Sequence, residues 1–227
     1  MLPLGGTARS ALGAQHEPAG PPQGRVLPLG GTARSALGAL LTAPQRRSEV
    51  RLIGGRWKRS KLPVVDAPGL RPTPDRVRET LFNWLGQDLT GWRCLDAFAG
   101  SGALGFEAAS RGADQVVLLE RDRRLALGLI DAKQRLKAEQ LRIETTDALT
   151  WMARCPPDSF ELVFIDPPFD APLIEPALAL AHRLVVPQGF VYVEAGQAVQ
   201  PPDGFKLHRQ SRAGAVHFHL FQRVDSP

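Results

Sequence analysis

The sequence predicts an α/β protein with a doubly wound sheet of seven strands, preceded by a small β-hairpin and a helix. Short apolar runs typical of buried strands alternate with stretches of helical periodicity. One run leads through a glycine-rich turn into a helix, the junction at which such sheets open a ligand pocket. The last two runs are separated only by a turn, which predicts a terminal hairpin. The expected strands are residues 92–95, 115–120, 141–145, 160–165, 189–194, 205–210 and 215–221.

Two short elements precede the sheet. Residues 50–53 and 62–65 have strand character and predict the hairpin. Thr73 is suited to an N-cap and Pro74 to the first helical position, and apolar residues then recur at helical spacing as far as Gly86. Within the sheet, Gly112 is placed to end the helix that follows the glycine turn. The helices expected between strands are residues 103–111, 125–138, 148–151 and 171–184.

Composition excludes several classes of protein. No apolar run approaches the roughly 18 residues that a membrane span requires. The two cysteines, Cys94 and Cys155, form no C-x-x-C pair, so a disulfide framework or a zinc site is not expected and a reducing, cytoplasmic location fits. His217 and His219 share one face of the last strand, but they have no carboxylate or cysteine company and predict no metal site.

The N-terminal segment differs from the rest of the chain. Residues 2–14, LPLGGTARSALGA, recur identically at 27–39, and the spacer between the copies is rich in Pro and Gly. Two such copies cannot build a core, so residues 1–47 are expected to be a disordered extension, with an organelle transit peptide as the alternative. Residues 48–86 are expected to form the hairpin and helix, and residues 87–227 the sheet domain.

Positive charge gathers near the start of the expected fold. The formal net charge is +5, and residues 48–78 carry eight basic side chains against three acidic ones. Basic and aromatic side chains interleaved in this way can bind phosphates and stack on bases. The alternative is a solvated edge hairpin with Trp57 packed on the body. The candidate RNA contacts are Arg51, Arg56, Trp57, Lys58, Arg59, Lys61, Arg71, Arg76 and Arg78.

The glycine turn allows two interpretations. Gly100, Gly102 and Gly105 spell G-x-G-x-x-G, which alone indicates a dinucleotide and an NAD-dependent oxidoreductase. Asp96, however, ends the preceding strand, where a carboxylate would repel a pyrophosphate but suit the ammonium group of a methionine. A second motif, D-P-P-F at residues 166–169, follows another apolar strand. Together the two motifs resemble the S-adenosylmethionine (SAM) loop and the D-P-P-F signature of methyltransferases that modify a base nitrogen.

Two further carboxylates follow strands of the expected sheet. Glu120 lies 20 residues after Gly100, where a carboxylate accepts hydrogen bonds from ribose hydroxyls, or it caps the helix that starts near Asp122. Asp147 lies at the corner that meets the adenine in SAM enzymes, or it is only the N-cap of the helix through Trp151. The sequence leaves both alternatives open.

Four stretches of the chain carry a more specific resemblance. They are RLIGGRWKRSKL (51–62), GLRPTPDRVRETLFNWL (69–85), LDAFAGSGALGFEAASRGA (95–113) and FIDPPF (164–169). On these stretches, from about Val50 onward, the chain resembles the RsmD family of 16S ribosomal RNA guanine-N2 methyltransferases. The family implies SAM as the methyl donor, no metal, and 16S RNA within a 30S subunit or an assembly intermediate as the partner of a monomeric enzyme.

The resemblance also implies roles for individual residues. The catalytic motif implied is Asp166, Pro167, Pro168 and Phe169. The Asp166 carboxylate and the Pro167 carbonyl would accept hydrogen bonds from the target amine, and Phe169 would stack on the base. The alternatives are a DNA or RNA adenine-N6 methyltransferase, which shares D-P-P-F, and a non-catalytic RNA-binding module. The cofactor residues implied are Asp96, Phe98, Gly100, Ser101, Gly102, Glu120, Asp147 and Ala148.

Overall fold

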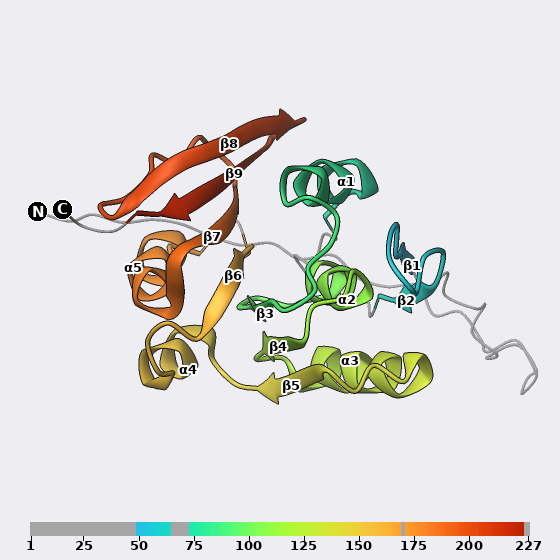
Figure 1. Ribbon diagram of the computed structural model, residues 1–227. Coiled ribbons are helices and arrows are strands. Elements are labelled where there is room, and N and C mark those ends of the chain that lie inside the picture. The colour runs from blue at the N-terminus through green and yellow to red at the C-terminus, as the bar shows by residue number, and fades with distance from the viewer. Residues whose placement is uncertain (1–48, 65–72, 169–170, 225–227) are drawn as a thin grey trace, which may run out of the picture. The chain divides into compact units, whose positions relative to one another are not determined.

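The computed structural model describes residues 49–64, 73–168 and 171–224. Seven strands form one sheet in the order β5-β4-β3-β6-β7-β9-β8 (Figure 1). The fold class predicted from the sequence is therefore confirmed, although the fifth strand begins at Val185 and not at residue 189. The strands are β3 (Arg93–Asp96), β4 (Gln115–Glu120), β5 (Leu141–Thr145), β6 (Phe160–Ile165), β7 (Val185–Ala195), β8 (Phe205–Ala213) and β9 (Val216–Arg223).

The order of the strands fixes where a ligand can bind. β3 pairs in parallel with β4 on one side and with β6 on the other. The chain adds β4 and β5 outward from β3, and then returns to add β6 and β7 on the opposite side. The strand order thus reverses between β3 and β6. In open sheets of this kind, ligands bind outside the carboxyl ends of the strands at such a reversal.

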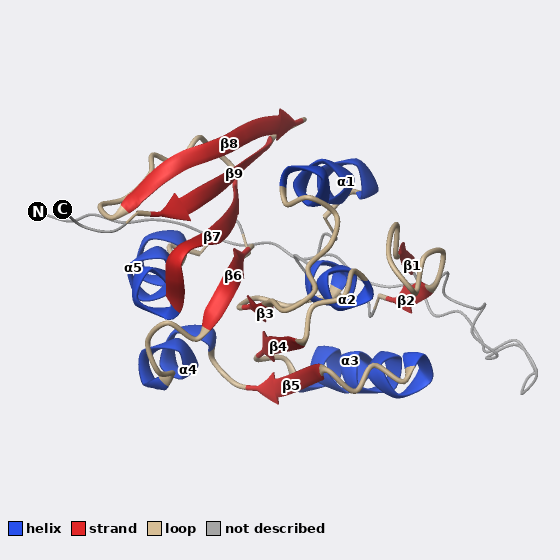
Figure 2. Cartoon of the chain, in the orientation of Figure 1, coloured by secondary structure: helices blue, strands red, loops and turns tan. Residues whose placement is uncertain are grey.

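Helices cover both faces of the sheet (Figures 1 and 2). On one face, Phe82, Phe106 and Leu129 belong to one apolar cluster that joins three helices to the sheet. On the other face, Met152 and Leu184 belong to a second cluster. Each such buried side chain stabilises the fold by roughly 1.5–3 kcal/mol. The first three helices are α1 (Asp75–Trp84), α2 (Ala103–Ser110) and α3 (Arg123–Leu136), and the other two are α4 (Ala148–Arg154) and α5 (Ile174–Leu184).

The N-terminal hairpin packs on the end of α2. Its strands are β1 (Glu49–Arg51) and β2 (Lys61–Pro63), which pair antiparallel as predicted. The Arg56 backbone N–H donates to the Ser110 carbonyl at 2.8 Å, and the Trp57 N–H donates to the Ser110 hydroxyl at 3.0 Å. The Trp57 side chain is partly buried against the apolar cluster beneath it. The hairpin is therefore tied to the C-terminal end of α2 through its turn.

A buried ion-pair network joins the hairpin to α1 and α2. The Arg78 side chain is fully buried, and its guanidinium donates to Glu107 Oε2 at 3.3 Å, to Asp75 Oδ1 at 2.6 Å and to the Arg51 carbonyl at 2.8 Å. Glu107, also fully buried, accepts a second hydrogen bond from Arg111 at 2.9 Å. A buried charge is tolerated only when it is paired in this way.

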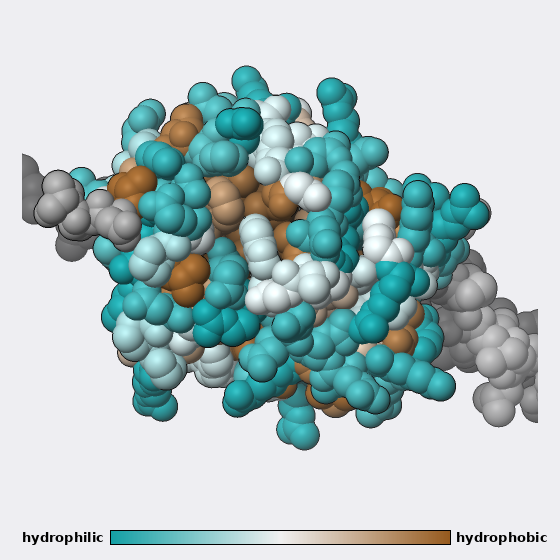
Figure 3. All heavy atoms as spheres, in the orientation of Figure 1, coloured by the Kyte–Doolittle hydropathy of each residue, from teal (hydrophilic) through white to brown (hydrophobic). Residues whose placement is uncertain are grey.

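Hydrophilic side chains dominate the face drawn in Figure 3, and apolar side chains show there only as smaller patches. No helix within residues 49–64, 73–168 and 171–224 is long and apolar enough to cross a membrane.

Candidate active site

A cleft of about 500 Å³ opens at the carboxyl ends of the central strands, where the strand order reverses. Its walls come from the loop after β3, the ends of β4 and β7, and the loop after β6. The segment before α1 and the turn between β8 and β9 complete the mouth. Segments that are far apart in sequence therefore meet at one site.

The glycine loop after β3 depends on two left-handed residues. Gly100 and Gly102 have φ angles of 51° and 77°, a region that side chains rarely adopt. Gly102 is the N-cap of α2 and does not line the cleft. A Cβ atom there would also stand 2.6 Å from the Leu129 side chain, so the φ angle and the packing against α3 both favour glycine at this position. Gly100 and Ser101, by contrast, do line the cleft.

Asp96 ends β3 at the floor of the cleft. It is only 2% exposed, and its Oδ2 accepts a hydrogen bond from the Gly105 N–H at 3.0 Å. Burial raises the pKa of Asp96 to about 7, and the nearby charges of Glu120 and Glu194 act in the same direction. Asp96 therefore holds the start of α2 in place while it faces the ligand space.

Glu120 ends β4 and braces the glycine loop. Its Oε2 accepts from the Gly100 N–H at 2.9 Å, and its Oε1 accepts from the Asp122 N–H at 2.7 Å. The cap of α3 is Asp122 itself, whose side chain accepts from the N–H groups of Arg124 and Leu125. Glu120 is thus not the capping residue, and each of its oxygens keeps a lone pair for a ligand hydroxyl.

Asp147 caps a helix and also lines the cleft. Its Oδ1 accepts from the Thr150 N–H at 2.9 Å, which makes Asp147 the N-cap of α4. This hydrogen bond lowers the pKa of Asp147. The same residue lines the cleft together with Ala148.

Asp166 follows β6 and receives an unexpected hydrogen bond. The Thr73 hydroxyl donates to Asp166 Oδ2 at 3.2 Å. The prediction that Thr73 caps α1 is therefore wrong, because its hydroxyl is used across the cleft. The N-cap of α1 is Pro74, which makes no side-chain capping bond. Burial, with the charges of Glu194 and Asp96, holds the pKa of Asp166 well above its usual range.

Glu194 is a site residue that the sequence analysis missed. It lies near the end of β7, is 3% exposed and lines the cleft. The Tyr192 hydroxyl donates to Glu194 Oε1 at 2.9 Å, and burial raises the pKa of the Glu194 carboxyl. The signal was visible in the sequence, because Glu194 directly follows an apolar run, as Asp96 and Glu120 do.

Comparison with known proteins places the chain in a family. The sequence pattern of the family described as "Conserved hypothetical protein 95" matches residues 50–222. A protein of Escherichia coli named Ribosomal RNA small subunit methyltransferase D is 43% identical over 180 residues, 77% of this chain and 90% of the relative. The chain belongs to the RsmD family.

Two further similar proteins agree with this assignment. A Haemophilus influenzae protein of the same name is 40% identical over 190 residues, 80% of this chain and 98% of the relative. The structure of a putative methyltransferase from Escherichia coli has a TM-score of 0.72 at 42% identity, and it covers 79% of this chain and 100% of its own.

Most of the residues predicted for catalysis and cofactor binding in this RsmD-family chain line the cleft. Phe169 lies outside the described residues, and Gly102 is set back behind the loop. Pro167 is buried, whereas Pro168 is exposed. The predicted residues brought together at the cleft are Asp96, Phe98, Gly100, Ser101, Glu120, Asp147, Ala148, Asp166, Pro167 and Pro168.

The candidate RNA contacts are dispersed by comparison. The prediction that Arg78 contacts RNA is wrong, because its side chain is fully buried against Glu107. Arg51 and Lys61 are exposed, but each forms an ion pair, with Asp75 and Glu49 respectively. Arg71 lies outside the described residues.

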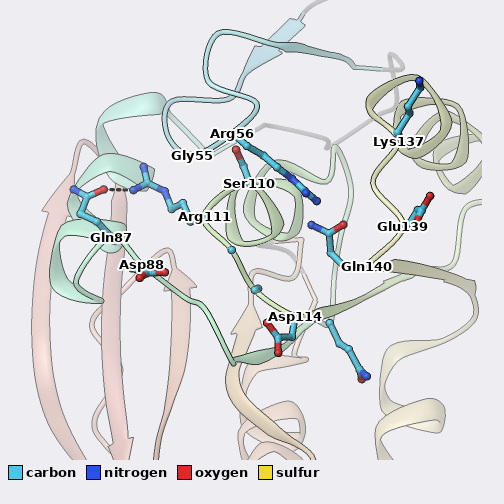
Figure 4. A pocket seen from close by; sticks show the side chains of 13 residues that line it. Gly55, Arg56, Gln87, Asp88, Ser110, Arg111, Asp114, Lys137, Glu139 and Gln140 are labelled. Atoms are coloured by element: carbon cyan, nitrogen blue, oxygen red, sulfur yellow. Dashed lines mark hydrogen bonds between the residues drawn. The ribbon is translucent and has the colours of Figure 1, made fainter.

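The turn of the N-terminal hairpin, with Arg56, Lys58 and Arg59, lies away from the cleft. It is hydrogen-bonded to Ser110, whereas Ala103 at the other end of α2 lines the cleft. Beside Arg56 is a second, open depression of about 890 Å³ (Figure 4). Its lining mixes cations such as Lys137 with the carboxylates of Asp88, Asp114 and Glu139, so it offers no uniform charge to a ligand.

Proposed function

We propose that this chain transfers a methyl group from SAM to the exocyclic N2 of a guanine in 16S ribosomal RNA. The proposal is supported by membership of the RsmD family and by the printed names of relatives as small-subunit ribosomal RNA methyltransferases. The observation that carries it is the cleft in which Asp96, Glu120 and Asp166, each from the end of a different parallel strand, line one space.

The cleft has the chemistry that SAM requires. Asp96 offers a carboxylate to the ammonium of the methionine part, and Glu120 offers a second carboxylate to the ribose diol. Phe98, Leu125 and Ala148 add apolar surface suited to an adenine ring. When bound, SAM supplies a methyl group on a sulfonium, which is transferred to the base.

The remaining residues prepare the target amine. A guanine exocyclic nitrogen is a poor nucleophile because its lone pair is delocalised into the ring. Hydrogen bonds from its two N–H groups to the Asp166 carboxylate and the Pro167 carbonyl favour a nitrogen whose lone pair points at the methyl group. The Thr73 hydroxyl fixes the orientation of the Asp166 carboxylate. Catalysis on this account is alignment and electrostatics, without a covalent enzyme intermediate.

The carboxyl group of Glu194 supports the same step. A methylated amine carries a positive charge until it loses a proton, and Asp166 is placed to receive that proton. Burial, together with the charge of Glu194, raises the pKa of Asp166, which makes the ionised carboxylate a stronger base. The Tyr192 hydroxyl holds Glu194 in place.

The substrate context follows from the same proposal. The partner is 16S RNA, either within a 30S subunit or in an assembly intermediate, and the enzyme acts as a monomer in the cytoplasm. No metal has a role in the chemistry proposed for Asp166.

Transfer of radiolabelled methyl groups from SAM tests the proposal. Purified protein is incubated with deproteinised 16S RNA or with 30S particles that lack the modification, and the RNA is then digested to nucleosides. We expect label in N2-methylguanosine, and a rate of labelling at least about a hundredfold lower with an Asp166→Ala variant that still binds S-adenosylhomocysteine.

Three other outcomes would point to a different function. Label in N6-methyladenosine would favour the adenine-specific alternative. SAM-independent RNA binding without any transfer would favour a non-catalytic module. Calorimetric binding of NAD in place of SAM would contradict the whole interpretation of the cleft.

A further inference from the structure

The C-terminal hairpin formed by β8 and β9 carries cations and no carboxylate. Residues 205–223 include Lys206, Arg209, Arg212 and Arg223 but neither Asp nor Glu. Arg223 pairs with Asp158. Within the described part of the chain, no carboxylate lies within ion-pair distance of the other three cations. All three are exposed, so their charges are available to a partner.

The cations of this hairpin approach the mouth of the cleft. Residues 213–216, which join β8 to β9, line the cleft itself. Arg212 pairs in register with His217, which in turn pairs with Ala195 at the end of β7. Arg212 therefore lies at the same end of the strands as Glu194. The Nε of Arg212 donates to the Gly214 carbonyl at 2.7 Å. Arg209 follows three residues back, about 10 Å along the strand.

β8 is also the outermost strand of the sheet. Its outer side has no neighbouring strand among the described residues, and Lys206, Arg209 and Arg212 are exposed along it. Because successive side chains of a strand alternate between its two faces, Arg209, opposite Leu220, and Arg212, opposite His217, flank this outer edge from opposite faces of β8. An extended chain of phosphates can run beside such an edge. Charged residues on an outer strand also discourage pairing with another protein strand. The edge is thus better suited to a polyanion than to a peptide.

The interior of the cleft makes external cations necessary. Asp96, Glu120, Asp147, Asp166 and Glu194 all line it, so the cleft carries an excess of carboxylates. Phosphates that flank a base inserted into this cleft would be repelled unless cations at the rim neutralised them. The cationic turn of the N-terminal hairpin lies at the opposite end of α2, roughly 11 Å from the start of that helix.

We propose that Arg209 and Arg212, on the outer edge of β8, hold the RNA phosphates next to the target nucleotide. The proposal rests on the function proposed above, and it moves the main RNA contact from the N-terminal hairpin to the C-terminal one. Guanidinium groups suit this role because they bind phosphate oxygens through two parallel hydrogen bonds. Lys206, further along the same edge, extends the binding surface away from the cleft.

Three double variants with equal loss of charge test this assignment. Arg209→Ala/Arg212→Ala removes the proposed phosphate-binding pair, and Arg56→Ala/Lys58→Ala removes the rival pair. Lys133→Ala/Arg154→Ala is the control, because both residues lie in the last turns of α3 and α4, away from the cleft. RNA affinity is measured as a function of salt concentration by fluorescence anisotropy, alongside the melting temperature and the affinity for S-adenosylhomocysteine.

We expect the Arg209/Arg212 variant to bind RNA about tenfold more weakly or worse. The slope of log affinity against log salt is negative, and in this variant it should become shallower by about 1 for each phosphate that is no longer neutralised. The KM for RNA should rise more than kcat falls. The control should keep the wild-type slope, and all variants should keep their melting temperature and cofactor affinity. A reduced slope in the Arg56/Lys58 variant alone, or an unchanged slope in the Arg209/Arg212 variant, would overturn the assignment.

The same data separate this proposal from the one on which it rests. If the wild-type protein methylates RNA and only the predicted surface is wrong, turnover persists while the Arg209/Arg212 variant behaves like the control. If the wild-type protein neither binds nor methylates 16S RNA, the proposed function fails, and the assignment of Arg209 and Arg212 fails with it.

Discussion

The hydroxyl of Thr73 donates a hydrogen bond to Asp166 Oδ2 at 3.2 Å, across 93 residues of sequence. This hydrogen bond ties the segment before α1 to the loop that carries the D-P-P-F motif. The Thr73 carbonyl in turn accepts from Arg78 Nε at 3.3 Å, so the buried ion-pair network supports the same segment. The position of the Asp166 carboxylate is therefore set by a residue outside its own loop.

Replacing Asp166 should separate catalysis from cofactor binding. We expect Asp166→Ala to lower kcat by roughly 10²–10⁴-fold, the usual effect of removing a positioned acid–base partner. Affinity for S-adenosylhomocysteine, measured by calorimetry, should change only a few fold, since Asp96 and Glu120 remain. Asp131→Ala, at an exposed position on α3, is the matched control. Turnover within tenfold of the wild type would show that Asp166 has no direct role.

Asp96→Asn should weaken cofactor binding but relieve a buried charge. The folded-state pKa of Asp96, about 7, lies above its value of 3.8 in an unfolded chain. The stability associated with this group is therefore fully present below pH 4 and is lost as the pH rises to about 7. The loss is on the order of 4 kcal/mol. Asn keeps an oxygen that can accept from the Gly105 N–H.

Unfolding by urea at pH 5 and pH 8 measures this effect. The difference in free energy of unfolding, Asp96→Asn minus wild type, should be larger at pH 8 than at pH 5, because only the wild type loses stability as Asp96 ionises. Its affinity for S-adenosylhomocysteine should fall by about 1.5–3 kcal/mol, the value of a charge-assisted hydrogen bond. A stability difference that is the same at both pH values would contradict the elevated pKa.

The sequence predicted the sheet and most of the residues that line the cleft, because both depend on local patterns. Apolar runs identify strands, and carboxylates such as Asp96 and Glu120 stand out at the strand ends. The glycine loop was also recognisable, although Gly102 is set back from the cleft and is favoured by its left-handed backbone and its packing against Leu129. These features require knowledge of only one or two elements at a time.

The predictions that failed depended on interactions between distant elements. Thr73 has the composition of an N-cap, and only the arrangement of β6 beside α1 reveals that its hydroxyl serves Asp166. Arg78 resembles a free surface cation until the hairpin covers α2 and buries Glu107. Sequence also could not tell at which edge of the sheet the turn with Arg56 would lie. Periodicity reports local burial, but it does not report which buried groups become neighbours.

The Arg78–Glu107 pair should be important for stability. Both side chains are fully buried. Without Arg78, Glu107 keeps its ion pair with Arg111, but it loses one of its two cationic partners, and the Thr73 and Arg51 carbonyls lose the donor that Arg78 supplies. We expect Arg78→Met to lower the free energy of unfolding by about 1–3 kcal/mol. Arg76→Met, on the exposed side of the same helix, should change it by less than about 0.5 kcal/mol. Equal effects of the two substitutions in urea titrations would show that the buried pair is not needed.

The carboxyl groups of Asp166 and Glu194, which line the cleft, predict opposite shifts in the pH dependence of kcat for two substitutions. Asp166 must be ionised to accept a proton, so kcat should rise with pH until the carboxyl has lost its own proton. The charge of Glu194 raises the pKa of Asp166, and the hydrogen bond from Thr73 lowers it. Glu194→Gln should therefore move the acidic limb of the kcat profile to lower pH, whereas Thr73→Val should move it to higher pH.

Matched variants distinguish this electrostatic effect from simple disruption of the site. Thr73→Ser keeps the hydroxyl that donates to Asp166, so its profile should coincide with that of the wild type. Tyr192→Phe removes the hydrogen bond to Glu194 Oε1 but leaves both carboxyl groups, so it should change the profile less than Glu194→Gln does. Arg78, Asp96 and Tyr192 are the other charged or titratable groups that influence this carboxyl pair, and all three are unchanged in Glu194→Gln and Thr73→Val. Damage to the fold would lower kcat at every pH without moving the limb. Shifts in the same direction for Glu194→Gln and Thr73→Val would mean that a group other than Asp166 controls the rate.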